Sequence, residues 1–275
     1  MGPCLDQRLP NRLCLPAIKE HLRTRWLGQQ TITYFDIVES TNTEANRLAR
    51  NGAPEGTLIV ADAQTSGQGR LGRSWASPPG SGLYLSIILR PSCPPAWLPR
   101  LTLTAGVAVA SAIQQTGVRP RLKWPNDILV AGRKVGGILA EAFFDKRRID
   151  FAILGIGINV NTEGPELPIS VRNLATSLRL SLGKAVSRIH LLQGLLYEFE
   201  QWYESFRTGA FETILETWRE FDTTLGNMVE VFLPETRVVG VAEALESDGT
   251  LLVRGKQGCL HRIVAGDVVH CCLCS

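Results

Sequence analysis

The sequence of 275 residues predicts an α+β fold, in which helices pack on a mixed or antiparallel β-sheet and a small β-barrel follows. Two observations predict this class. Up to about residue 224, short apolar runs of strand length alternate with longer runs of helical period. Beyond that point, only short strands separated by turn residues occur. We therefore expect an N-terminal segment (1–30), a main domain (31–224) and a C-terminal barrel domain (225–275).

The first half of the main domain is predicted as strands around one helix. Thr41 and Glu44 fit the S/T-x-x-E capping box, so a helix is expected to begin there. Gly52 is expected to end it. A glycine-rich loop separates the second strand from the third. The strands are expected at 31–40, 56–64 and 83–90.

The second half continues with a buried helix over 97–117, ended by Gly117, and with further strands. The turns between these strands are short, so neighbouring strands are expected to run antiparallel. Residues 186–222 carry apolar side chains at helical spacing, which we interpret as core packing. The three strands are expected at 121–130, 134–144 and 149–160, and the helical stripe comprises Leu191, Leu195, Phe199, Trp202 and Phe206.

Composition is that of an ordinary globular protein, with 44% hydrophobic and 20% charged residues. The net charge of +3 is too small to indicate nucleic-acid binding. No run reaches the roughly 18 apolar residues that a membrane span needs. Charged residues and prolines near the start argue against a secretory signal, at Pro3, Asp6, Arg8 and Pro10.

The seven cysteines are an odd number without framework spacing, which predicts a reducing, cytoplasmic setting. Cys271, Cys272 and Cys274 lie together near the C-terminus. Adjacent ligands without a second pair make a poor tetrahedral metal site, so we expect free thiols there and no metal site.

The loop "QTSGQGRLGRSW" contains G-x-G-x-x-G, formed by Gly67, Gly69 and Gly72. A dinucleotide fingerprint needs a helix after the third glycine. Here Pro78 and Pro79 follow, and they exclude a continuing helix. The sequence also has no Walker A motif and no kinase catalytic motifs.

Two interpretations of this loop remain. It is either a solvated surface loop, or it wraps an anion with backbone N–H groups and the guanidinium groups of Arg70 and Arg73. Lys123 is likewise either solvated or a fixed cation aimed at phosphate. Two predicted strands also contain residues that favour a nearby ligand. One has a pair of glycines, which let the backbone approach a ligand or another chain closely, and the other has isolated polar residues in an apolar run. These residues are Gly136, Gly137, Asn159 and Asn161.

Four blocks then resemble the successive signatures of biotin–protein ligases: "ESTNTEA", "QTSGQGRLGRSWASPPGSGLYLSI", "LKWPNDILVAGRKVGGILAE" and "GIGINVN". They cover about residues 30–165 in the family's order. The resemblance implies the biotin–lipoate ligase catalytic fold, which is like that of class II aminoacyl-tRNA synthetases, with an SH3-like C-terminal barrel.

The resemblance implies a two-step reaction of a biotin–[acetyl-CoA-carboxylase] ligase. Biotin and ATP form biotinyl-5′-AMP with Mg²⁺, and the biotinyl group passes to a lysine ε-amine of the apo biotin carboxyl carrier protein. No nucleic acid and no membrane are expected as partners, because only about 30 residues precede the first strand block. An exposed sheet edge would serve either a homodimer or carrier docking.

By resemblance, the catalytic residues are Lys123 and Arg70. Many family members carry a basic residue where this chain has Gln68, which leaves the role of Gln68 open. No metal ligand is assigned to the protein. Biotin binding is expected from Ser40, Thr41, Asn42, Gln64, Gly67, Gln68, Gly69, Arg70, Lys123 and Gly137, and ATP binding from Arg70, Arg73, Trp75, Asn126, Lys134 and Asn159.

Two alternatives stay open. A lipoate–protein ligase or octanoyl transferase would share the fold and modify a similar lysine, but lacks the G-R-L-G-R-x-W and K-W-P-N-D blocks. A non-catalytic biotin-binding module would be expected to lose its phosphate-facing cations.

Overall fold

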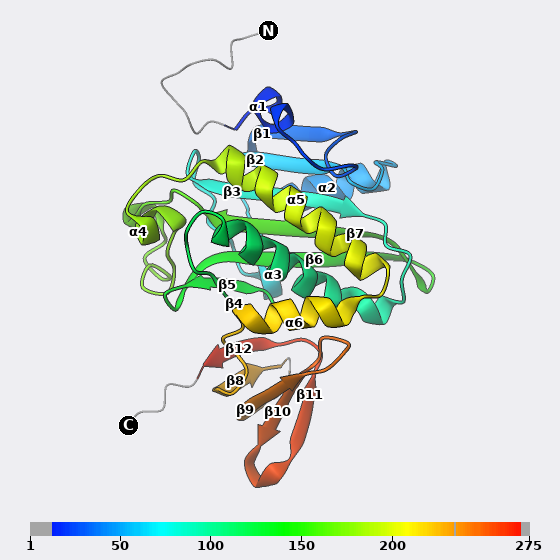
Figure 1. Cartoon of the computed structure of the whole chain (residues 1–275), viewed down its shortest axis with the longest axis vertical. Helices are drawn as coiled ribbons and strands as arrows, with labels where there is room; N and C mark the ends of the chain where they lie inside the picture. The colour runs from blue at the N-terminus through cyan, green and yellow to red at the C-terminus, as the bar shows by residue number, and fades with distance from the viewer. Residues whose placement is uncertain (1–12, 234, 271–275) are drawn as a thin grey trace.

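The computed structural model describes residues 13–233 and 235–270 and contains two β-sheets (Figure 1). The larger sheet has seven strands in the order β1-β2-β3-β7-β6-β5-β4. Only β1 and β2 pair in parallel, so the expected mixed sheet is confirmed. Its strands are β1 (Ile32–Val38), β2 (Leu58–Gln64), β3 (Gly82–Leu89), β4 (Arg121–Lys123), β5 (Asp127–Val130), β6 (Arg133–Asp145) and β7 (Arg148–Asn159).

Helices cover the two faces of this sheet unequally. Helices α3 (Leu98–Gln114), α5 (Arg188–Arg207) and α6 (Phe211–Phe221) pack together on one face and enclose the main core (Figure 1). The other face carries α2 (Thr41–Arg50) over a small second cluster that includes Ile88 and Ile153. Two shorter helices are α1 (Leu15–Glu20) and α4 (Leu178–Leu182). The second face is therefore left partly free of helices, and the site lies there.

The predicted helix over 97–117 is confirmed as α3, and Gly117 follows it with φ of +90°. Among the described residues, Pro95–Gln114 is the one run long and apolar enough to cross a membrane. Most of it is buried against the sheet and α5, which is typical of a core helix.

Two local predictions were wrong in detail. The helix after the first strand is capped by Ser40, whose side chain accepts a hydrogen bond from the Thr43 N–H, so Thr41 is the first helical residue. The run 121–130 forms two strands, because the chain reverses between Lys123 and Asp127. The reversal contains Pro125, which has no N–H to donate to a strand ladder.

The second sheet has five antiparallel strands in the order β11-β10-β9-β8-β12. Only residues 264–266 join β11 to β12, although these strands lie at opposite ends of the order. A flat five-stranded sheet would separate its edges by about 19 Å, whereas the linker reaches about 14 Å. The sheet must therefore curl, as expected for an SH3-like barrel. Its strands are β8 (Met228–Phe232), β9 (Arg237–Leu245), β10 (Leu251–Gly255), β11 (Leu260–Ile263) and β12 (Asp267–His270).

The limits of the expected domains stay a prediction. Within the described part of the chain, Cys93 and Cys259 are free thiols, whereas Cys14 is disulfide-bonded, which the expected reducing setting did not predict. The cysteines at 271, 272 and 274 lie outside the described residues.

Buried Glu200 on α5 fixes the segment before β1. Its side chain has no exposed surface, and its carboxylate accepts hydrogen bonds from the backbone N–H groups of Arg25, Trp26 and Leu27 at 2.7–3.0 Å. Three orphan backbone donors are thus satisfied by one side chain.

We predict that Glu200→Ala lowers the free energy of unfolding by roughly 3 kcal/mol or more, because it strands buried donors. Glu198→Ala on the same helix removes only an exposed hydrogen bond to Gln115 and should change stability by less than about 0.5 kcal/mol. Urea unfolding followed by circular dichroism measures both. Equal losses in the two variants would contradict the proposed anchoring role.

Candidate active site

The floor of the site is a stretch of sheet without side chains. Gly155 and Gly157 lie on one face of β7, about 7 Å apart along the strand, and Gly157 pairs with Gly137 of β6. A Cβ atom at Gly155 would lie 2.2 Å from Asn42 Oδ1, and one at Gly157 would lie 2.6 Å from Trp75 Nε1. The glycines therefore let two side chains from other elements lie directly on the sheet.

The glycine loop after β2 folds back on itself as a short hairpin. The Trp75 N–H donates to Gly67 O at 2.8 Å, and the Gly69 N–H donates to Arg73 O at 2.7 Å. A Cβ at Gly67 would lie 2.4 Å from Trp75 O, so the hairpin requires glycine there. Leu71 at its tip is exposed and has φ of +54°. Gln68 bridges to Ser74 within the hairpin and faces solvent.

Both loop arginines contact the second sheet. Arg70 donates to Asn126 Oδ1 at 3.0 Å and to Gly266 O at 3.2 Å, and its Nη1 lies 3.7 Å from an Asp267 carboxylate oxygen. Arg73 forms an ion pair with the same carboxylate. Burial lowers the pKa of Arg70, although a guanidinium stays protonated in a protein. Asp267 thus ties the loop to β12.

A second carboxylate holds two lysines at the turn of the β4–β5 hairpin. Asp127 lies 2.5 Å from Lys134 Nζ and 3.3 Å from Lys123 Nζ. Burial acts to raise the pKa of Asp127, but the two ammonium groups outweigh it and hold that pKa below its ordinary value.

The two lysines face different surroundings. Lys134 Nζ lies 5.6 Å from the centre of the Trp75 ring, and its side chain reaches the space above Gly137. Burial and then the charge of Lys123 lower the pKa of His270 on β12. Lys134 is therefore the lysine that adjoins the glycine loop.

A buried hydrogen-bonded network lies at the start of α2. Gln64 Oε1 accepts from the Thr41 N–H at 2.8 Å, and Gln64 Nε2 donates to Ser77 Oγ at 2.8 Å. Ser86 Oγ of β3 lies 2.6 Å from Asn42 Oδ1 and 2.8 Å from Thr41 Oγ1. Asn42 Nδ2 donates to a Glu141 oxygen of β6 at 2.6 Å.

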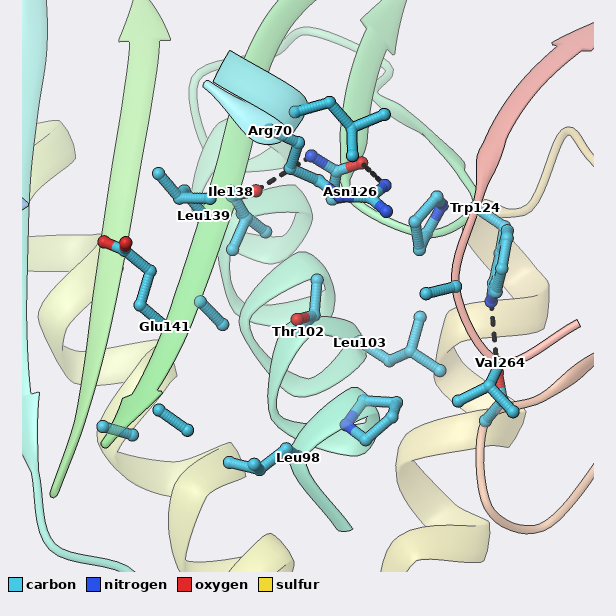
Figure 2. A pocket seen from close by; sticks show the side chains of 18 residues that line it. Arg70, Leu98, Thr102, Leu103, Trp124, Asn126, Ile138, Leu139, Glu141 and Val264 are labelled. Atoms are coloured by element: carbon cyan, nitrogen blue, oxygen red, sulfur yellow. Dashed lines mark hydrogen bonds between the residues drawn. The ribbon is translucent and has the colours of Figure 1, made fainter. Parts of the chain in front are cut away.

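A groove of about 380 Å³ opens beside Arg70 (Figure 2). It is bounded by the N-terminal turns of α3, by β6 and by the second sheet. Trp124 lies in its wall and donates from Nε1 to Gly249 O at 3.1 Å, which joins the two sheets. Its lining is mostly apolar, with Arg70, Thr102, Asn126 and Glu141 as the polar members.

The structure gathers most of the expected residues along one face of the sheet. Ser40, Thr41, Asn42 and Gln64 form one end, and Arg70, Trp75, Asn126, Lys134 and Gly137 the other. Asn159 lies at the end of β7, where its amide donates to Thr176 O and ties the strand to the next segment. Which residues contact a ligand stays a prediction.

Five further polar residues belong to this arrangement and were missed. Asp127 stands in the K-W-P-N-D block, so it was available as a signal. Ser86 and Glu141 are single polar residues in otherwise apolar strands, a weaker signal of the same kind. Ser77 and Asp267 have no local signature. The missed set is Ser77, Ser86, Asp127, Glu141 and Asp267.

The described residues contain no group of three His, Cys, Asp or Glu side chains able to hold a metal ion. Asp127 is already shared between two lysines. A divalent cation would therefore depend on ligands that this part of the chain does not supply.

Comparison with known proteins gives consistent matches. Residues 34–159 match the model of the biotin/lipoate A/B protein ligase family. The "Bifunctional ligase/repressor BirA" of Bacillus subtilis (strain 168) is 38% identical over 94% of this chain and 79% of its own length. The biotin–[acetyl-CoA-carboxylase] ligase of Mycobacterium tuberculosis (H37Rv) is 36% identical over 94% of this chain and 98% of its length.

Solved structures show the same likeness. The biotin protein ligase of Aquifex aeolicus in complex with biotin and ATP superposes with a TM-score of 0.75 at 32% identity, covering 87% of this chain and 98% of that one. The biotin protein ligase of Leishmania major in complex with biotinyl-5-AMP gives 0.59 at 25% identity, over 86% and 99%.

We predict that Asp127→Asn destabilises the fold at neutral pH and not in acid. A carboxyl group with a depressed folded pKa adds stability above its unfolded value of about 3.8, and loses it as pH falls through the lower folded value. The difference in unfolding free energy between wild type and variant should thus be full at pH 6 and shrink below pH 3.8. Urea titrations across this range measure it, and a constant difference would refute the pairing.

Proposed function

The chain belongs to the biotin/lipoate A/B protein ligase family, and from that membership we propose that it is a biotin–protein ligase. It activates biotin with ATP as biotinyl-5′-AMP and transfers the biotinyl group to a lysine of a carrier protein. The names of its relatives and the ligands of the matching structures, which are biotin, ATP and biotinyl-5-AMP, support this activity. The B. subtilis relative is named as both a ligase and a repressor, and we propose only the ligase activity for this chain.

One observation favours biotin over lipoate within this family. The site has a neutral hydrogen-bonding end at Asn42, which lies against Gly155, and a cationic end at Lys134, which lies beside Trp75 above Gly157. Gly155 and Gly157 are about 7 Å apart along β7. Biotin has a ureido ring at one end and a carboxylate at the other. The dithiolane ring of lipoate has no N–H group, so it could not donate a hydrogen bond to the hydroxyl oxygens of Thr41 and Ser86.

In the first step, a biotin carboxylate oxygen attacks the α-phosphorus of ATP, and the bond to pyrophosphate breaks. Two anions must approach each other, so fixed cations are needed to offset their repulsion. By resemblance to the family, this role is expected of Lys123 and Arg70. We propose that Lys134 carries it with Arg70, because Lys134 Nζ lies 5.6 Å from the centre of the Trp75 ring, at the end of the loop that holds Arg70.

In the second step, the ε-amine of the carrier lysine attacks the biotinyl carbonyl carbon. The bond to the phosphate oxygen breaks, AMP leaves, and the amine loses its proton. We propose that the lysine enters through the groove beside Arg70, which is the opening next to the cationic end. We propose that the reaction takes place in the cytoplasm, in line with the odd number of cysteines without framework spacing.

Mg²⁺, when bound, would neutralise charge on the triphosphate. Because the described residues provide no cluster of metal ligands, we propose that phosphate oxygens and water hold the ion. No residue of this part of the chain is assigned to it.

We predict that incubation with biotin, Mg·ATP and an apo biotin carboxyl carrier domain adds one biotinyl group to the carrier, seen by intact-mass spectrometry. Omission of ATP should abolish the addition. Lipoate in place of biotin should give neither adduct nor pyrophosphate. A lipoyl adduct would indicate the lipoate ligase alternative, and biotin binding without ATP-dependent transfer would indicate a non-catalytic binding module.

We further predict that Lys134→Met lowers kcat for biotin-dependent pyrophosphate release by about 10²–10³, as expected for loss of one preorganised charge. Lys123→Met is the matched control from the same ion-pair cluster and should lower kcat by less than about tenfold. Single-turnover measurements separate chemistry from product release. A larger loss for Lys123→Met would restore the assignment made from the sequence.

A further inference from the structure

The tip of the glycine loop, residues 68–74, has little that fixes its position over the sheet. Its backbone hydrogen bonds run between the two arms of its own hairpin. Leu71 is 71% exposed and has a positive φ, and Gly72, Arg73 and Ser74 are exposed as well. Among these described residues, no buried apolar side chain therefore anchors the tip.

Two arginines supply the attachment that apolar packing does not. In the described part of the chain, the side-chain hydrogen bonds and ion pairs between the tip and the rest of the protein come from Arg70 and Arg73. One partner is the Asn126 side chain, in the turn of the β4–β5 hairpin. The others are Gly266 O and the Asp267 carboxylate, at the start of β12. The second sheet thus holds the loop.

Asp267 is placed to hold both arginines at once. The next residue, Val268, is buried in the barrel, so the alternation of a strand directs Asp267 outward, to the loop. Its carboxylate lies 3.7 Å from Arg70 Nη1 and forms an ion pair with Arg73. The Asp267 side chain is 23% exposed, so salt and water screen these pairs less than they screen fully exposed ones. Loss of this carboxylate would remove the ion pairs of both arginines together.

The contacts with the second sheet leave Arg70 able to meet a ligand. Its contacts with Asn126, Gly266 and Asp267 all involve the Nη1 atom. A guanidinium carries five N–H groups, so those on Nη2 and Nε remain for a phosphate. Arg70 and Leu71 also line the groove, and Figure 2 shows Arg70 and Asn126 together beside it. The position of the tip therefore sets how widely the site opens there.

The chemistry of the intermediate makes this opening matter. Biotinyl-5′-AMP is a mixed anhydride, which water or any unprotonated amine can attack. It must stay in the site until the carrier lysine arrives, and a detached tip would let it diffuse away. A contact that holds the tip down therefore also protects the intermediate.

We propose that Asp267 is a positioning residue that holds the glycine loop closed over the biotinyl-adenylate through Arg70 and Arg73. The inference rests on the proposed function and deepens it, because it makes the second sheet part of the enclosure around the reactive intermediate. Asp267 acts through the two arginines and does not itself touch the reacting atoms.

The test measures how fast the intermediate leaves the enzyme. The enzyme is loaded with labelled biotin, Mg·ATP and pyrophosphatase, chased with unlabelled biotin, and assayed for bound label by rapid desalting. Asp267→Asn keeps the shape of the side chain but loses its charge, so we expect the off-rate to rise roughly three- to thirtyfold. Biotinylation of serum albumin, which has no carrier domain, should rise with it.

Two further variants serve as controls. Glu230→Gln removes a carboxylate of similar exposure, 22%, from the neighbouring strand β8, where its ion-pair partner is Arg237 and not the loop. It should leave the off-rate within about twofold of the wild-type value. Asp267→Glu keeps the charge on a longer side chain and should restore most of the retention that Asp267→Asn loses.

Salt provides a readout that a packing role would not change. Ions screen an ion pair, so the wild-type off-rate should rise at least about threefold between about 0.05 and 0.5 M salt. In Asp267→Asn the rise should be smaller, because the ion pairs with the loop are already lost. The wild-type measurement does not depend on the folding of any variant.

The outcomes are distinct. Failure of wild type to form biotinyl-adenylate would overturn the proposed function together with this inference. An unchanged off-rate in Asp267→Asn, or an equal rise in Glu230→Gln, would overturn the role of Asp267 alone. A wild-type off-rate independent of salt would reject that role as well, and so would an Asp267→Glu variant that loses the intermediate as fast as Asp267→Asn.

Discussion

Three cations, Arg70, Lys123 and Lys134, converge at one end of the site, and their mutual repulsion must be offset before the protein can hold any anion there. Two carboxylates do this. Asp127 lies between the lysines, and Asp267 faces Arg70. Each carboxylate is shared by two cations, so it neutralises only part of their positive charge. The net positive charge that remains is what an approaching phosphate would meet.

The opposite end of the site carries the reverse balance. Glu141 has no cation beside it in the described part of the chain, so this end repels an anionic tail while the Lys134 end attracts it. Between them the sheet offers only glycine backbone. Hydrogen bonds and long-range charge would thus favour the same orientation of a ligand with one neutral and one negative end. The negative end would lie toward Lys134 and the neutral end toward Asn42.

Much of the fold followed from periodicity. The buried helix α3, the central strands and their antiparallel pairing were predictable, because apolar runs of those lengths have few other ways to be buried. The split of 121–130 into two strands was not predicted, although Pro125 was in view, because the run is apolar on both sides of it. The Ser40 cap was missed by one position, since Ser40 and Thr41 both suit that role.

The site was only partly predictable, for a different reason. Arg70, Lys134, Asn42 and Gln64 stand in blocks that resemble a family, so they could be named. Asp267 and Glu141 act through contacts across more than ninety residues of chain, to Arg70 and Asn42 respectively, and no local pattern encodes such a pairing. The choice between Lys123 and Lys134 likewise depends on the contact of Lys134 with Trp75, which lies 59 positions earlier in the chain.

The short connection between β11 and β12 limits the insertions and deletions that the gene encoding this chain can tolerate. Residues 264–266 bring Gly266 O and the Asp267 carboxylate to the arginines of a loop about two hundred positions earlier. Successive side chains of a strand point to opposite faces. A single codon inserted there would turn the residue that follows to the wrong side, so deletions and duplications at this spot should be purged.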